Sequence, residues 1–167
     1  MRKYKNIIYT SITIAAILVV LVIVFQPTES GQLGPVSQND SVALTAEESL
    51  FDFGNISMAE GMVTHDFKIQ NLDTEPVMIS KIYTSCMCTS AELVTDSGSK
   101  GPFGMAGHGF LPAVNELVGV NEDATIRVTF DPAAHGPAGI GRADRVVYVE
   151  QKSGAKLNLR FTAFITP

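Results

Sequence analysis

Two cysteines that lie one position apart are the residues of this sequence best suited to chemistry. Cys86 and Cys88 follow a predicted strand and flank Met87. Two thiols at this spacing can converge on one metal ion or close a small disulfide, although ring strain makes a bridge across one residue rare. The spacing leaves three hypotheses open: a metal site, a disulfide with a structural or redox role, and a pair of inert free thiols.

A histidine in each of two irregular segments can complete a metal site with these cysteines. His108 lies in a long segment rich in Gly and Pro, and His135 lies in a shorter one. In an up-and-down sandwich, the loop that carries the cysteines and the loop that carries His135 open at the same end. This topology predicts Cys86, Cys88 and His135 at one pole, and the loop of His108 is long enough to return there.

The chemistry of this pole depends on which sulfur atoms take part. Two thiolates and two imidazoles suit Zn²⁺ in a closed tetrahedral site. Thioethers are soft ligands, and their participation would favour Cu(I) instead. The sequence therefore predicts a copper or zinc site, although either histidine could simply hydrogen-bond within its own loop. The predicted ligands are Cys86, Cys88, His108 and His135, with Met87 and Met105 as weaker candidates.

Other classes of function find less support. The third histidine, His65, lies on the apolar face of a predicted strand and is expected to be a core residue. No Ser-His-Asp spacing, phosphate-binding glycine loop or pair of carboxylates stands out, so no catalytic residue is predicted and an enzyme is the less favoured class. The net charge of −5 argues against nucleic acid as a partner.

The N-terminal region reads as a membrane anchor. Residues 7–25 carry no charge and are long enough to cross a bilayer as a helix. Arg2, Lys3 and Lys5 precede this run, and no Lys or Arg follows until Lys68, so residues 1–6 are predicted in the cytoplasm and the rest outside. A cleaved signal peptide is the alternative, but the apolar run is long for one and no A-x-A site follows it. We therefore expect a single-pass protein of the cell (inner) membrane with an extracytoplasmic C-terminal domain.

The remainder of the chain reads as a linker followed by strands. Residues 26–47 are rich in Gly, Pro and Ser and are expected to be flexible. From residue 48 to residue 167 the apolar residues alternate with a period of two, and no segment keeps a helical period. This pattern predicts an all-β, immunoglobulin-like antiparallel β-sandwich of about seven strands. The expected strands lie near residues 50–53, 63–69, 77–83, 90–94, 126–130, 146–149 and 157–165.

Four motifs in order resemble a family of exported bacterial domains of unknown function, DUF1573. The resemblance covers about residues 48–166 and implies an immunoglobulin-type sandwich related to the ASPM/SPD-2/Hydin domains, but it brings no established activity. The family commonly has Gly where this chain has Met87, and the loops that carry His108 and His135 are enriched beyond the family pattern. The motifs are FDFGNI at 51–56, the alternation V-x-H-x-F-x-I-x-N at 63–71, TSCxCT at 84–89 and VTFDP at 128–132.

Three functions are compatible with these features. The first is a membrane-tethered, extracytoplasmic binding module with a Cys/His metal site, whose partners are the membrane and other envelope proteins. The second is a thiol–disulfide redox role for the pair Cys86 and Cys88. The third is a purely structural or adhesive protein-interaction domain, in which substitution of the cysteines would have little effect.

Overall fold

The computed structural model describes residues 43–167. The predicted cytoplasmic N-terminus, the anchor 7–25 and most of the linker lie outside the described residues. Within residues 43–167, none of the helices has the length and apolar character needed to span a membrane.

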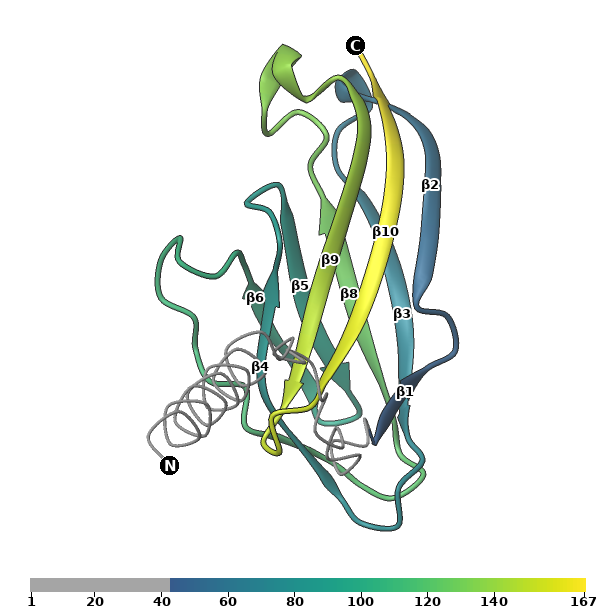
Figure 1. Ribbon diagram of the computed structural model, residues 1–167, viewed down its shortest axis with the longest axis vertical. Coiled ribbons are helices and arrows are strands. Elements are labelled where there is room, and N and C mark those ends of the chain that lie inside the picture. Colours follow the sequence, from purple (N-terminus) through teal and green to yellow (C-terminus); the bar gives the residue numbers. More distant parts are fainter. Residues whose placement is uncertain (1–42) are drawn as a thin grey trace, which may run out of the picture. The chain divides into compact units, whose positions relative to one another are not determined.

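The described residues form ten strands in two five-stranded sheets (Figure 1). The first sheet contains, in spatial order, β1 (Leu44–Ala46), β3 (Val63–Asn71), β8 (Asp123–Phe130), β5 (Thr89–Thr95) and β6 (Gly98–Phe103). The second sheet contains β2 (Leu50–Ser57), β10 (Lys156–Thr166), β9 (Gly141–Gln151), β4 (Val77–Thr84) and β7 (Glu116–Val118). Two short 3₁₀ helices, η1 (Met58–Glu60) and η2 (Gly136–Gly139), lie in loops.

The alternation of apolar residues explains why these segments pair as a sandwich. In β8, Ile126 and Val128 are fully buried, whereas Arg127 between them is exposed. In β10, Leu159 and Phe161 are buried in the same alternating way. Because successive side chains of a strand point to opposite faces, each sheet has one apolar face, and the two faces form the core. Each fully buried large side chain contributes about 1.5–3 kcal/mol.

All seven predicted strands are present, but the prediction of about seven strands is too low. The three strands that the sequence pattern missed are β1, β6 and β7. Two of them have only three residues, too few for a period-two pattern, and β6 contains Pro102 and two glycines, which strand predictions avoid. Leu44–Ala46, which the sequence assigned to the end of the linker, pairs with β3, and Leu44 is fully buried.

The sandwich is also mixed rather than purely antiparallel. Strand β2 runs parallel to β10, and the register of this pair shifts between Thr162 and Phe164. All other strand pairs in residues 43–167 are antiparallel. Alternation of apolar residues predicts a strand without predicting its direction relative to its neighbours, so this feature could not be read from the pattern.

Candidate functional site

The cysteines lie in a tight turn that passes from one sheet to the other. The turn (residues 85–88, here the cysteine turn) joins β4 of the second sheet to β5 of the first. The buried Thr84 hydroxyl donates to the Cys86 carbonyl at 2.9 Å, and the amide of Thr89 donates to the same carbonyl at 3.2 Å. The Ser85 amide donates to the Val146 carbonyl of β9 at 2.9 Å. These bonds fix the backbone of the turn between both sheets.

Cys86 and Cys88 form a disulfide within this turn. Their Cα atoms are 5.3 Å apart, within the usual range for a disulfide. The two sulfurs lie in different surroundings, because Cys88 is only 3% exposed and belongs to the core, whereas Cys86 is only partly buried at its edge. The amide of Cys88 donates to Cys86 Sγ at 3.3 Å. The pair thus spans from the core toward the surface.

His135 meets the disulfide because of the register between β5 and β8. Thr89 lies opposite Phe130, so the residue that follows β8 lies beside the residue that precedes β5. The Asp131 amide accordingly donates to the Cys88 carbonyl at 2.9 Å. From this anchor the loop of residues 131–140 (the β8–β9 loop) turns back and brings His135 Nε2 to 3.2 Å from Cys86 Sγ.

Short local hydrogen bonds give the β8–β9 loop its shape. Asp131 Oδ1 accepts from the Ala133 amide at 2.9 Å, an Asx-type turn. The Gly136 amide donates to the Ala133 carbonyl at 2.8 Å, and η2 follows directly. Gly136 has a φ of 55°, a left-handed conformation that favours glycine. Gly136 therefore helps the loop to turn back, so that the His135 imidazole reaches the cysteine turn. The imidazole itself is exposed.

Arg145 contacts the other sulfur and was not anticipated from the sequence. Its Nε donates to Cys88 Sγ at 3.2 Å, and its Nη1 donates to the Asp144 carbonyl at 2.9 Å. The available signal was its position in β9, between the buried Ala143 and Val147 on the inward face of the strand. A charged residue at an inward position needs a partner. Here that partner is a sulfur of the disulfide.

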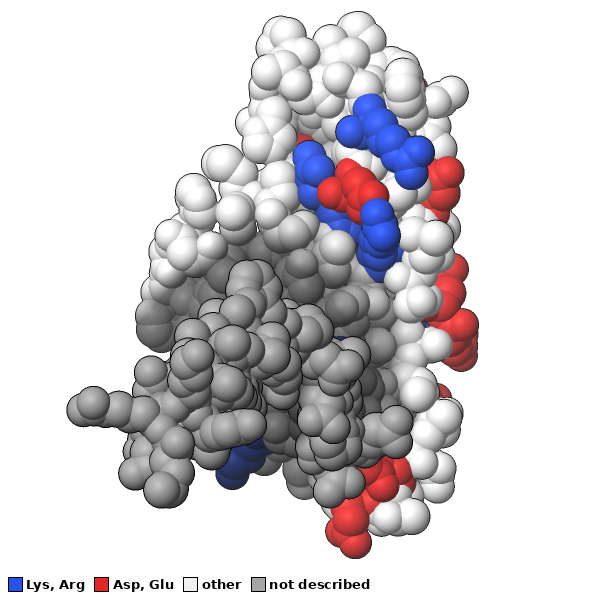
Figure 2. All heavy atoms as spheres, in the orientation of Figure 1, with Lys and Arg blue, Asp and Glu red and all other residues white. Residues whose placement is uncertain are grey.

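Charged side chains lie close to Asp144, the neighbour of Arg145 in β9. Figure 2 shows basic side chains gathered around an acidic one in the upper part of the domain. Asp144 has such surroundings, because Arg160 hydrogen-bonds its carboxylate and Arg142 and Arg145 lie near it. The hydrogen bond from Arg160, supported by the positive charges, holds the pKa of Asp144 below its ordinary value. The ion pair of Arg160 with Asp144 therefore ties β10 to β9 next to Arg145.

The predicted ligands are only partly brought together. The ligand atoms of Cys86, Cys88 and His135 all lie within 4.8 Å of one another, and within residues 43–167 this is the one group of His, Cys and acidic residues with metal-binding spacing. His108 is not part of the group and is exposed. Its loop begins beside the cysteine turn, since Met105 bridges to Thr84, but the chain then leads away.

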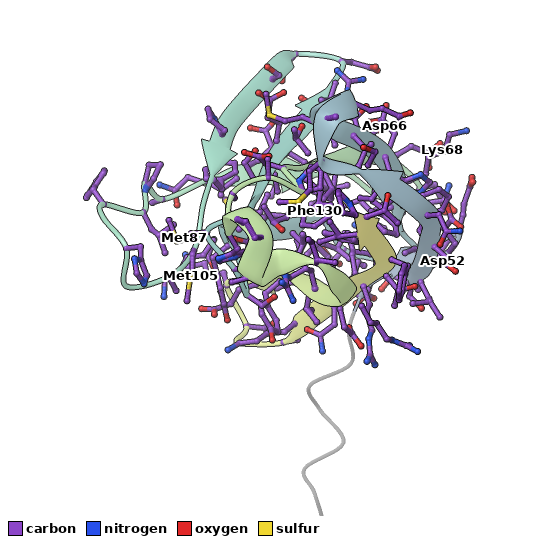
Figure 3. All side chains as sticks on the ribbon, turned by 90° about the horizontal axis from the view of Figure 1, so that it is seen from above. Asp52, Asp66, Lys68, Met87, Met105 and Phe130 are labelled. Atoms are coloured by element: carbon purple, nitrogen blue, oxygen red, sulfur yellow. A yellow bond between two sulfur atoms is a disulfide. The ribbon has the colours of Figure 1, made fainter. Side chains whose placement is uncertain are left out.

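The two weaker candidates, Met87 and Met105, lie near the cysteine turn. Figure 3 shows Met87 and Met105 together at one side of the domain. Met87 is 61% exposed. His65, expected in the core, is only partly buried; its ring stacks on Phe51 with 3.6 Å between centroids, and its Nε2 lies 2.7 Å from Glu48 Oε1. His65 is thus a partnered residue of an aromatic cluster.

Solved structures share the fold at low sequence identity. A protein of unknown function from Porphyromonas gingivalis aligns with a TM-score of 0.52 and 11% identity over 73% of this chain and 46% of that chain. A family 123 glycoside hydrolase from Clostridium perfringens aligns with a TM-score of 0.52 and 6% identity over 74% of this chain and 27% of that chain. This chain therefore spans less than half the length of either protein, and the likeness shows the fold alone. No curated protein matches the chain.

A family model matches residues 44–105 and is described as "Protein of unknown function (DUF1573)". The match includes β1 to β6 and the cysteine turn, and with them the first three of the four motifs seen in the sequence; the motif at 128–132 lies outside it. It ends before His135 and Arg145, so these two side chains that contact the sulfurs lie beyond the matched region. Over residues 44–105, the chain is therefore similar to the DUF1573 family.

Proposed function

We propose that the domain carries out thiol–disulfide exchange through Cys86 and Cys88. The observation that carries this proposal is the contact of 3.2 Å between His135 Nε2 and the partly exposed Cys86 Sγ of the disulfide. An imidazole at this distance can take the proton of an incoming thiol and return it to a departing one. Redox-active cysteines are found in such partly exposed, proton-donating surroundings.

The small ring argues against a mainly structural role for this disulfide. A bridge stabilises a protein mostly by restricting the unfolded chain, and the effect grows with the length of the closed loop. For cysteines separated by two positions the chain-entropy estimate is only about 1.5 kcal/mol. The turn is already fixed by the bonds of Thr84 and Thr89. Substitution of both cysteines by serine is therefore expected to leave the sandwich folded.

The location is part of the same proposal and is supported by the sequence. Residues 7–25 would tether the domain to the inner membrane, with the sandwich on the extracytoplasmic side. The resemblance to exported, immunoglobulin-like domains supports this placement. Disulfides persist in such compartments, so a reversible pair there would exchange with thiols of envelope proteins.

Redox equilibration of the full chain tests the proposal. The chain has two cysteines, so the thiols that appear in glutathione buffers of graded potential report this pair alone. We expect two thiols to appear together and to disappear on reoxidation while the fold is kept. The Cys86→Ser/Cys88→Ser variant, which has no thiol, is the negative control. A pair that stays oxidised until the protein unfolds, or thiols that never oxidise, would overturn the proposal.

Metal binding by the reduced pair is the second candidate. The observation that favours it is the grouping of Cys86, Cys88 and His135 within 4.8 Å. Two thiolates and one imidazole suit Zn²⁺ or Cu(I), and a thioether of Met87 or Met105 would bias the site toward copper. Such binding requires the disulfide to be open, so it would alternate with the oxidised state.

Metal titration of the reduced chain tests this candidate. Stoichiometric binding of Zn²⁺ or Cu(I) in competition with a chelator is the expected result, and oxidation of the pair should release the ion. Equal binding by the Cys86→Ser/Cys88→Ser variant, or no stoichiometric binding of either metal, would contradict it.

A further inference from the structure

We infer that exchange at this site has a fixed polarity: the substrate sulfur attacks Cys86, and Cys88 leaves as a thiolate held by Arg145. The inference rests on the proposed thiol–disulfide function and assigns different roles to the two sulfurs. Arg145 then acts as a catalytic residue, because its Nε contacts a reacting atom at 3.2 Å.

Access to the sulfurs selects Cys86 as the point of attack. Exchange requires a thiolate to approach one sulfur from the side opposite to the other. Cys88 is 3% exposed and packs with the core, so an incoming thiolate cannot reach it. Cys86 is only partly buried and has His135 beside it. Attack from the surface on Cys86 directs the departing electron pair inward to Cys88.

A thiolate at Cys88 would be unfavourable without a cation. Burial among apolar side chains disfavours the charged form of a thiol. The guanidinium of Arg145 brings a positive charge and donates directly to this sulfur. Its Nη1 donates to the Asp144 carbonyl at 2.9 Å, so the guanidinium is already directed at Cys88 before the disulfide bond breaks. This preorganised charge is suited to a leaving group that is buried.

The exchange balances with a dithiol as the reductant. The first substrate thiol gives its proton to His135, and its sulfur bonds to Cys86 Sγ as the Cys86–Cys88 bond breaks and leaves an electron pair on Cys88. The second substrate thiol loses its proton to solvent and attacks the substrate sulfur of this mixed disulfide. Cys86 leaves and regains the proton from His135. The substrate is oxidised to a disulfide, and the pair is reduced to a Cys86 thiol and a Cys88 thiolate.

Arg142 provides a matched control on the same strand. It lies three positions before Arg145, is exposed, and approaches the outward Asp144 carboxylate rather than a sulfur. Replacing either arginine by glutamine removes one positive charge from β9. Only replacement of Arg145 removes a donor from Cys88, so a difference between the variants reports that contact and not the net charge.

The first experiment measures reduction of the oxidised full chain by excess glutathione, with alkylation of the released thiols at successive times. We expect Arg145→Gln to slow the reaction by about tenfold or more, the usual effect of losing a hydrogen bond to a charged group. Arg145→Lys, which keeps a cation, should recover part of the rate. Arg142→Gln should stay within about twofold of the wild type, since exposed charges contribute little.

The second experiment tests the point of attack without changing Arg145. Glutathione disulfide should modify the thiol of the Cys88→Ser variant, which retains Cys86, at least about tenfold faster than that of the Cys86→Ser variant, because access limits the reaction.

The outcomes separate the inference from the proposed function. A wild-type pair that glutathione cannot reduce in the folded chain ends both. A reducible wild-type pair whose rate is the same in Arg145→Gln and Arg142→Gln overturns the role of Arg145. Faster modification of Cys88 than of Cys86 overturns the polarity. If Arg145→Gln does not fold, Arg145→Lys is compared with Arg142→Lys: a slower rate in Arg145→Lys alone supports the role of the Arg145 Nε donor, and equal rates overturn it.

Discussion

Two glycine-rich loops of this domain each carry one histidine, yet only one of them contributes to the site. The β8–β9 loop brings His135 to 3.2 Å from Cys86 Sγ. The loop of residues 104–115 (the β6–β7 loop) starts equally close to the cysteine turn, since the Thr84 amide donates to the Gly104 carbonyl at 3.0 Å, but its His108 is exposed and outside the group.

The difference lies in what fixes each loop. The β8–β9 loop begins where a central strand ends, and the pairing of Phe130 with Thr89 sets its first residue against Cys88. The β6–β7 loop joins two edge strands and is held at its far end by Lys100, which donates to the Val114 carbonyl at 3.1 Å. Strand register therefore positions a side chain more strictly than loop composition does.

The largest expected contrast is between Phe130, at the base of the β8–β9 loop, and Phe110, in the β6–β7 loop. Phe130 is 1% exposed and packs on Phe161, and Figure 3 shows it near the middle of the domain. Phe130→Ala should lower the free energy of unfolding by about 3–5 kcal/mol. Phe110 is 90% exposed, and Phe110→Ala should change the free energy of unfolding by less than about 0.5 kcal/mol. Denaturant unfolding measures both, and equal effects would contradict the packing described above.

Metal affinity of the reduced chain should separate the two histidines next. His135→Ala removes one of three grouped ligands and should weaken Zn²⁺ or Cu(I) binding by about tenfold or more, in the range seen for the loss of groups that support a metal site. His108→Ala should leave the affinity unchanged. Chelator competition provides the measurement. A loss of affinity in His108→Ala would show that the β6–β7 loop closes onto the metal.

The kinetics of thiol–disulfide exchange should also distinguish His135 from His108. His135→Gln keeps a polar side chain but cannot relay a proton at neutral pH, and we expect reduction by glutathione to slow by about tenfold. His108→Gln is the matched control and should react at the wild-type rate. If both variants react alike, His135 does not take part in proton transfer.

The smallest effect is electrostatic and belongs to the β6–β7 loop. The hydrogen bond from Lys100 lowers the pKa of Glu116 below its ordinary value. A carboxyl whose pKa is lowered in the folded state stabilises that state above its unfolded pKa, and this contribution is lost as the pH falls through the folded pKa. Acidification below about pH 4 should therefore loosen the β6–β7 loop, at less than about 1 kcal/mol for a pair near the surface.

Hydrogen exchange of the loop amides checks this contrast. Protection near Val114 should fall at acidic pH and should be insensitive to pH in Glu116→Gln. The Asp131 and Gly136 amides of the β8–β9 loop, which bond to backbone carbonyls, are the internal control. Equal loss of protection in both loops would mean that acid loosens the whole domain instead.

The sequence predicted much of the core but less of the site. Alternation found every long strand, and the common pole of the cysteines and His135 followed from strand order. It could not find β1 or β7, because three residues carry no period. The pattern could not exclude His108 as a ligand, because a long loop has no strand pairing that fixes where its residues lie. Arg145 was missed because its partner, a sulfur across the sandwich, becomes visible only when β9 and β5 are placed together.

Nuclear magnetic resonance of the histidine rings during one redox cycle tests the central claim most directly. The chain has three histidines, so His65 and His108 serve as references for His135. Reduction of the full chain by a dithiol should shift the His135 ring signals, reoxidation should restore them, and the other two rings should keep their positions. The account is contradicted if the folded chain releases no thiols, or if His108 responds to reduction while His135 does not.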